Sequence, residues 1–178
     1  MQNFTYFSDF ERTKFTDDIH GVLGRSLIVA TRFDNLCKSL ARFIDYKTVA
    51  IVKTIITDDE YGEIVNKILG HHTNLNRVIK GLPIDNEIKE ILHKAREARN
   101  SIAHSLAIGL EGVFDFKEKN EIDGLIDNIK KLIEHIIKGD VIISAYISTM
   151  NKESIPACFF EKTYEEQVVD WVITRHES

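Results

Sequence analysis

The chain has 178 residues and a mass of 20.4 kDa, the size of a single domain that can bury a hydrophobic core without disulfides or metals. Its 9 Gly and 2 Pro are too few for a turn-rich all-β protein or a disordered chain, and its two cysteines, Cys37 and Cys158, lie too far apart for a CxxC metal site. The net charge of −5 argues against a protein that coats nucleic acid through bulk positive charge.

The first long helix is indicated by apolar residues that recur at steps of three and four from about Phe15 to Tyr46. Thr57 and Glu60 then match a capping box, which predicts a short helix that stops near Gly70. Both segments therefore favour helices over strands.

The middle of the chain continues the helical pattern. Another short helix is expected within residues 71–81, and Pro83 breaks the chain after it. Asp85 or Asn86 can cap the next helix, which should end before Gly109. This next helix carries the most unusual polar residues of the sequence.

The last third of the chain contains a second long amphipathic pattern. Residues 110–116 are read as a loop or a stub of strand. A helix starts near Asn120 and either ends near residue 139 or continues to about Asn151, although the β-branched run at 141–143 is the main place where a strand could occur. A final helix is predicted over residues 164–173.

These elements predict an all-α protein, an up-down helical bundle of five or six helices. We expect one domain over residues 1–178, with its core at about 15–151 and a C-terminal helical extension at 152–178. Cys37 should lie in the core, and Trp171 should anchor the last helix. The aromatic start should pack across a dimer, in preference to interleaving with bases; its members are Phe4, Tyr6, Phe7 and Phe10.

Positive charge is concentrated in two segments of this acidic protein. Residues 21–53 contain six basic and two acidic side chains, and residues 71–104 contain six basic side chains, four acidic ones and four of the 7 His. A local cationic face of this kind suits one phosphate-bearing ligand better than a long duplex. The alternative is that these charges only line solvated helix faces.

The polar cluster of the predicted helix over residues 86–106 has a spacing that brings several groups together. Arg96, Asn100 and His104 lie four residues apart, so they share one face of an α-helix. Arg99 precedes His104 by five residues, which is about 140° around the helix and roughly 7 Å along its axis. Arg99 is long enough to bend towards His104 or to reach across to a partner.

The chemistry of this cluster suits work on a phosphate. Arginine presents a planar fork of donors to phosphate oxygens, and histidine can exchange a proton near neutral pH. Together they could cleave RNA without a metal or cofactor, because RNA supplies its own nucleophile, the 2′-hydroxyl. One histidine cannot easily perform both proton transfers, whereas a two-fold dimer would bring two copies together.

The sequence Arg99-Asn100-x-x-Ala103-His104 resembles the R-x4-6-H motif of HEPN domains (higher eukaryotes and prokaryotes nucleotide-binding). Such proteins are all-α bundles, commonly dimers, and many are metal-independent endoribonucleases of toxin–antitoxin, abortive-infection and CRISPR-associated systems. The resemblance implies that Arg99 and His104 are catalytic and that Asn100 assists them. Leu106 stands where some HEPN toxins have a tyrosine, so modification of that tyrosine by a partner enzyme is not expected here.

The resulting hypothesis is a homodimeric endoribonuclease with a composite Arg/His site and a toxin or phage-defence role. Arg96 would contribute to substrate binding, and the partners would be RNA, a second copy of the chain and an antitoxin or other defence protein. One alternative is a non-catalytic module of the same fold that binds a nucleotide, RNA or a partner. Another is a purely structural helical dimer.

Two further expectations concern what the protein lacks. A metal site built from His71 and His72 with His93 or His135 is disfavoured, because no i, i+4 histidine pair or accompanying cysteine supports it. The longest apolar runs are too short to cross a membrane, and the N-terminus lacks the features of a signal peptide. We therefore expect a soluble, cytoplasmic protein.

Overall fold

The computed structural model describes residues 14–71, 74–106 and 119–174, and every regular element within these ranges is helical. The expected all-α fold with five or six helices is confirmed, and the strand considered at 141–143 is wrong because those residues lie inside a helix. The expectations for residues 110–116 and for the aromatic start fall outside the described residues. The elements are α1 (Lys14–Val52), α2 (Asp58–His71), α3 (Leu75–Gly81), α4 (Asn86–Asn100), the π-helical turn η2 (Ser101–Ser105), α5 (Lys119–Asn151), the 3₁₀ turn η3 (Ala157–Phe160) and α6 (Lys162–Ile173).

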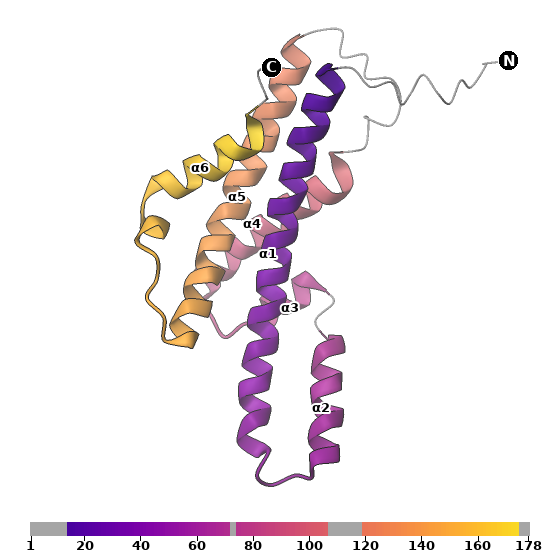
Figure 1. The fold of residues 1–178 in the computed structure, drawn as a ribbon, viewed down its shortest axis with the longest axis vertical. Coiled ribbons are helices and arrows are strands. Elements are labelled where there is room, and N and C mark those ends of the chain that lie inside the picture. Colours follow the sequence, from indigo (N-terminus) through magenta and orange to yellow (C-terminus); the bar gives the residue numbers. More distant parts are fainter. Residues whose placement is uncertain (1–13, 72–73, 107–118, 175–178) are drawn as a thin grey trace, which may run out of the picture.

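The core lies where the two long helices α1 and α5 pack against each other and against α4, which crosses behind α1 in Figure 1. Cys37 is fully buried there, as expected, and burial raises the pKa of its thiol. Apolar side chains at helical spacing supply the rest of this core; they include Val22, Phe33, Leu40, Leu92, Ile129, Ile133, Ile136 and Ile143.

Helix α5 continues through Gly139, and the missing side chain of this glycine allows α4 to approach α5 closely. A Cβ atom at Gly139 would lie 2.7 Å from the Cβ of Ala95 and 2.7 Å from Cε2 of Phe33. Any larger residue would therefore push α4 or α1 away. The buried, small side chains of Ala95 and Ala98 confirm that another helix packs closely against this part of α4.

The C-terminal half of α1 pairs with α2 as a helical hairpin that extends beyond the other helices (Figure 1). The predicted capping box starts α2. The backbone N–H of Thr57 donates to Oε2 of Glu60 over 2.9 Å, and the backbone N–H of Glu60 donates to Oγ1 of Thr57 over 3.3 Å. The bonds from Thr57 lower the pKa of Glu60. This hairpin ends next to α3, which forms one side of the site described below.

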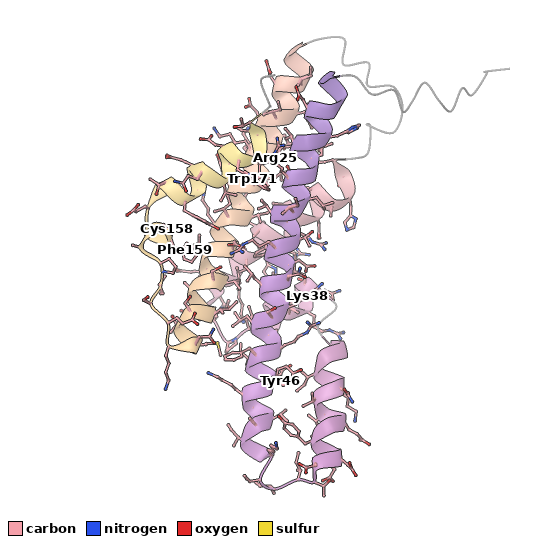
Figure 2. All side chains as sticks on the ribbon, in the orientation of Figure 1. Arg25, Lys38, Tyr46, Cys158, Phe159 and Trp171 are labelled. Carbon is pink, nitrogen blue, oxygen red and sulfur yellow. The ribbon has the colours of Figure 1, made fainter. Side chains whose placement is uncertain are left out.

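Helix α6 is held by valines and by an arginine of α1, near the labelled Arg25 and Trp171 of Figure 2. Arg25 donates from Nε to the carbonyl oxygen of Val172 over 3.0 Å and from Nη2 to that of Thr174 over 2.7 Å. Val169 and Val172 are buried, whereas Trp171 is 50% exposed. The expectation that Trp171 anchors this helix is therefore wrong, because the valines three residues apart occupy the buried face.

Within the described ranges, no helix has the length and apolar character needed to cross a membrane.

Candidate active site

The polar cluster lies at the end of α4, where the helical hydrogen-bonding pattern changes. Arg96, Arg99 and Asn100 belong to the last turns of α4, and the π-helical turn follows directly. The backbone N–H of Leu106 donates to the carbonyl oxygen of Ser101 over 2.9 Å, a bond that spans five residues. Such turns occur frequently at functional sites. His104 lies within this turn and is exposed.

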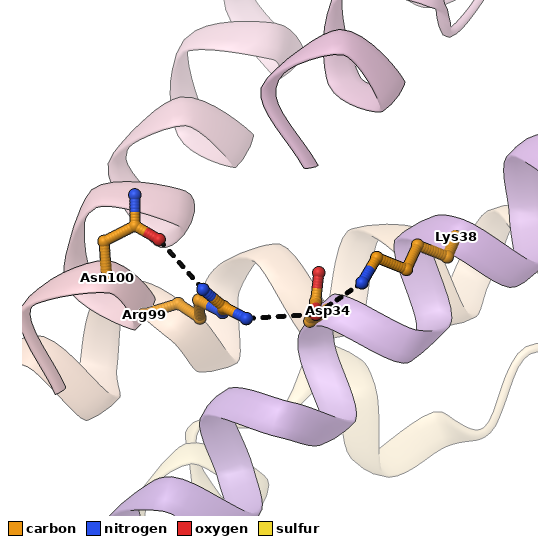
Figure 3. Close-up of polar contacts among 4 residues, drawn as sticks. All are labelled: Asp34, Lys38, Arg99 and Asn100. Atoms are coloured by element: carbon orange, nitrogen blue, oxygen red, sulfur yellow. Dashed lines mark hydrogen bonds and ion pairs between the residues drawn. The ribbon is translucent and has the colours of Figure 1, made fainter. Parts of the chain in front are cut away.

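Arg99 reaches across to α1, where it binds Asp34 (Figure 3). Nη2 of Arg99 donates to Oδ2 of Asp34 over 3.1 Å, and Nη1 donates to Oδ1 of Asn100 over 3.1 Å. Nζ of Lys38, one turn along α1, donates to the same Oδ2 over 2.8 Å. One carboxylate oxygen thus accepts from two cations on different helices. This network fixes the guanidinium against α1, whereas the sequence left open whether it bends towards His104 or reaches across to a partner.

A cavity of about 360 Å³ lies beside this network, between α1, α3 and α4. Three cationic side chains and one carboxylate line it, so its charge favours an anion. The labelled Lys38 lies at mid-length on α1 and beside α3 in Figure 2. The full lining consists of Asp34, Lys38, Asn74, Leu75, Asn76, Arg96, Arg99 and Asn100.

Two buried polar atoms of this lining have no hydrogen-bond partner in the part of the chain that the structure describes. They are Oδ1 of Asp34 and Nε of Arg96. The Asp34 residue is only 6% exposed, so its unused oxygen is not accounted for by bulk solvent. Buried polar atoms usually find a partner, and an unpaired one costs about 1 to 3 kcal/mol. The pair of atoms marks this pocket as a place where a polar ligand would complete the hydrogen bonding.

The structure brings three of the four expected site residues together. Arg96, Arg99 and Asn100 line the cavity, whereas His104 is exposed and does not belong to its lining. The α-helical spacing predicted one face for Arg96, Asn100 and His104. The helix changes from α-helical to π-helical bonding at Ser101, between Asn100 and His104, so the regular α-helical spacing behind that prediction does not hold across this segment.

The sequence reasoning missed the four polar lining residues that α1 and α3 with its N-cap contribute: Asp34, Lys38, Asn74 and Asn76. Asp34 carried a signal that could have been used. It sits within the apolar stripe of α1 formed by Ala30, Phe33 and Cys37, and a carboxylate on a buried face requires a partner. The positions of the two asparagines carried no such signal.

A second ion pair connects α1 to the other side of the bundle. Nε of Arg32 donates to Oδ1 of Asp140 over 3.0 Å, and the Asp140 side chain is only 4% exposed. Burial raises the pKa of Asp140, against the opposing effects of Arg32 and Tyr164. Burial and the neighbouring Asp140 also raise the pKa of Tyr164. This pair joins α1, α5 and α6.

The structure does not test the histidine-based metal site that was considered from the sequence. The side chains of His71 and His72 fall outside those that the structure describes. Among the described residues, no three His, Cys, Asp or Glu side chains are grouped as metal ligands.

Comparison with known proteins found no match to any family model, to any curated protein or to any solved structure. The function therefore has to come from the residues of this chain, with the HEPN resemblance as a proposal.

Proposed function

We propose that this chain is a metal-independent, HEPN-type endoribonuclease that acts as a homodimer, with a toxin or phage-defence role and an antitoxin or other defence protein as a partner. The observation that carries the proposal is the end of α4. There, Arg99 and Asn100 are hydrogen-bonded to each other at a cation-rich cavity, and an exposed histidine follows in a π-helical turn.

In this mechanism, the 2′-hydroxyl oxygen of one nucleotide attacks its own 3′-phosphorus and loses its proton to His104. The bond from phosphorus to the 5′-oxygen of the next nucleotide breaks, and that oxygen takes a proton from the partner subunit's His104. The products are a 2′,3′-cyclic phosphate and a 5′-hydroxyl. The two-fold dimer supplies the second imidazole that one chain lacks.

Arg99 stabilises the negative charge that builds on the phosphate oxygens in the transition state. Its bonds to Asp34 and Asn100 use two of the five N–H donors of a guanidinium. The side chain is 25% exposed and lines the cavity, so its remaining donors can meet a phosphate. Asp34 and Asn100 would hold the guanidinium plane in a fixed orientation.

Cleavage of single-stranded RNA by the purified protein in the presence of EDTA tests this function. We expect His104→Ala to lower the rate by about 100-fold or more, since general acid–base catalysis typically contributes about 10² to 10⁴. His135→Ala is the matched control, because His135 is an exposed histidine on α5 away from the cavity. RNA with 2′-O-methyl groups should resist cleavage. Equal rates for the two histidine variants would reject the assignment.

A second candidate function is a binding module of the same fold without turnover. The position of His104 outside the cavity lining, and the neutralisation of Arg99 by Asp34, favour this alternative. It predicts nucleotide or RNA binding that Arg99→Ala weakens, with no product over long incubation. The EDTA assay separates it from the nuclease.

A further inference from the structure

The cavity beside Arg99 contains more hydrogen-bonding groups than the proposed cleavage reaction uses. Lys38 comes from α1, Arg96 from α4, and Asn74 and Asn76 from α3 and its N-cap. The cleavage step requires only one guanidinium and the imidazoles. The remaining groups therefore require an explanation of their own.

The existing bonds determine what the asparagines can offer to a ligand. Oδ1 of Asn74 accepts from the backbone N–H of Arg77 over 3.2 Å, which caps α3, and Oδ1 of Asn100 accepts from Arg99. With both oxygens engaged, the amide nitrogens Nδ2 are the groups that can donate to a ligand. The cavity is therefore rich in donors, from the amides of three asparagines and from three cationic side chains.

The volume and charge of the cavity limit the ligand. About 360 Å³ is at the small end of the roughly 300 to 1,000 Å³ of ligand pockets, which suits one nucleotide and not an extended strand. The excess of cations over the single carboxylate suits a phosphate. Among the described residues, the buried Nε of Arg96 and Oδ1 of Asp34 have no hydrogen-bond partner, so a polar ligand could complete the hydrogen bonding of the lining.

We propose that this cavity is the binding site for one nucleotide of the RNA, adjacent to the phosphate that is cut. Lys38 and Arg96 bind the phosphate of that nucleotide, and the amides of Asn74 and Asn100 donate to carbonyl oxygens of its base. The cavity thus favours uracil or guanine, which present carbonyl oxygens to these amides, over adenine, which has none. The inference rests on the proposed function for the position of the cut, whereas nucleotide binding itself can be measured separately.

Calorimetric titration of the full chain with uridine 3′-monophosphate tests the binding site directly. Adenosine 3′-monophosphate should bind about fivefold or more weakly, since one good base contact contributes about 1 to 3 kcal/mol of discrimination. Inorganic phosphate should bind more weakly than either nucleotide. Phosphate that binds as tightly as uridine 3′-monophosphate would reduce the cavity to an anion site and overturn the proposal.

Two pairs of variants locate the contacts. Asn74→Asp keeps an oxygen that caps α3 but replaces the donating amide with a carboxylate, and Asn66→Asp adds the same charge at an exposed position on α2. Lys38→Gln removes a cation from the cavity, and Lys80→Gln removes an exposed one outside it. We expect at least tenfold weaker nucleotide binding for the first member of each pair and no change for the second. Equal binding within both pairs would contradict the site, and circular dichroism confirms that each variant is folded.

The nucleotide site and the nuclease activity can each be rejected without rejecting the other. Nucleotide binding that depends on Asn74 and Lys38, without any cleavage that depends on His104, would leave the nucleotide site standing and reject the nuclease. Cleavage that depends on His104, with the bases beside the cut unchanged by Asn74→Asp, would leave the nuclease standing and reject this site.

Discussion

Helix α1 carries two ion pairs to other helices, Asp34 with Arg99 and Arg32 with Asp140, and their surroundings differ sharply. The Arg32 pair joins three helices, and its buried carboxylate lies beside Tyr164. The Asp34 pair lies at a cavity and shares its carboxylate with Lys38, and one oxygen of Asp34 has no partner within residues 14–71, 74–106 and 119–174. The same two residue types therefore join buried helix surfaces in one place and line a cavity in the other.

The largest expected effect that separates the two pairs is on RNA cleavage. Arg99→Ala should lower the rate by about 10² to 10³, the range for removing a donor that stabilises a developing oxyanion, whereas Arg32→Ala should leave the rate unchanged. Single-turnover cleavage at saturating enzyme measures both variants. A similar loss in the two variants would show that the arginines act through stability and not through the reaction.

The free energy of unfolding should show the opposite order. Arg32→Ala leaves the buried Asp140 without its cation and should cost about 1 to 3 kcal/mol, the range for a buried polar group left unsatisfied. Arg99→Ala should cost less, because Asp34 keeps its bond to Lys38. Urea denaturation at neutral pH checks this order, and a larger cost for Arg99→Ala would contradict it.

The contact between α4 and α5 links the two regions, because Gly139 precedes Asp140 and packs on Ala95 of the helix that carries Arg99. Gly139→Ala should destabilise the fold by about 1 to 3 kcal/mol, the usual cost of overpacking. Gly124→Ala is the control: it lies on the same helix, where an added Cβ would have no atom within 4 Å, and it should stabilise by about 0.4 to 1 kcal/mol. Thermal unfolding followed by circular dichroism distinguishes the two, and equal shifts would disprove the close contact.

The smallest effect is a pH dependence that belongs to Asp140. Its pKa in the folded state is raised above 3.8, so the folded protein binds this proton more tightly than the unfolded chain. As the pH falls from neutral through the raised pKa, the wild type should gain stability relative to Asp140→Asn. The gain should stop below the unfolded value of about 3.9. Urea denaturation of both proteins across this pH range measures the difference in their free energies of unfolding. If the wild type became less stable relative to Asp140→Asn as the pH falls, the raised pKa of Asp140 would be refuted.

Most of the fold was accessible from the sequence because it depends on local patterns. Apolar spacing predicted the long helices, and Thr57 and Glu60 predicted the start of α2. The pattern did not decide whether α5 continues past Gly139, because low helix propensity is outweighed there by packing against Ala95. Trp171 was misassigned because size alone does not show which face of a helix is buried.

The site was accessible only in part because it joins residues far apart in the sequence. Arg96, Arg99 and Asn100 were found as neighbours on one helix. The bond between Asp34 and Arg99 spans 65 residues, and helical periodicity carries no information about such pairs. The π-helical turn that contains His104 was also not predicted, since the spacing argument assumed a regular α-helix throughout.

Because of the π-helical turn η2, the number of residues between two side chains does not alone determine the angle between them around the helix. A single wide turn at the end of α4 can take up one surplus residue while the preceding turns of α4 keep their packing on α5. The number of residues between an arginine and a histidine can then vary by one while the supporting scaffold stays as it is.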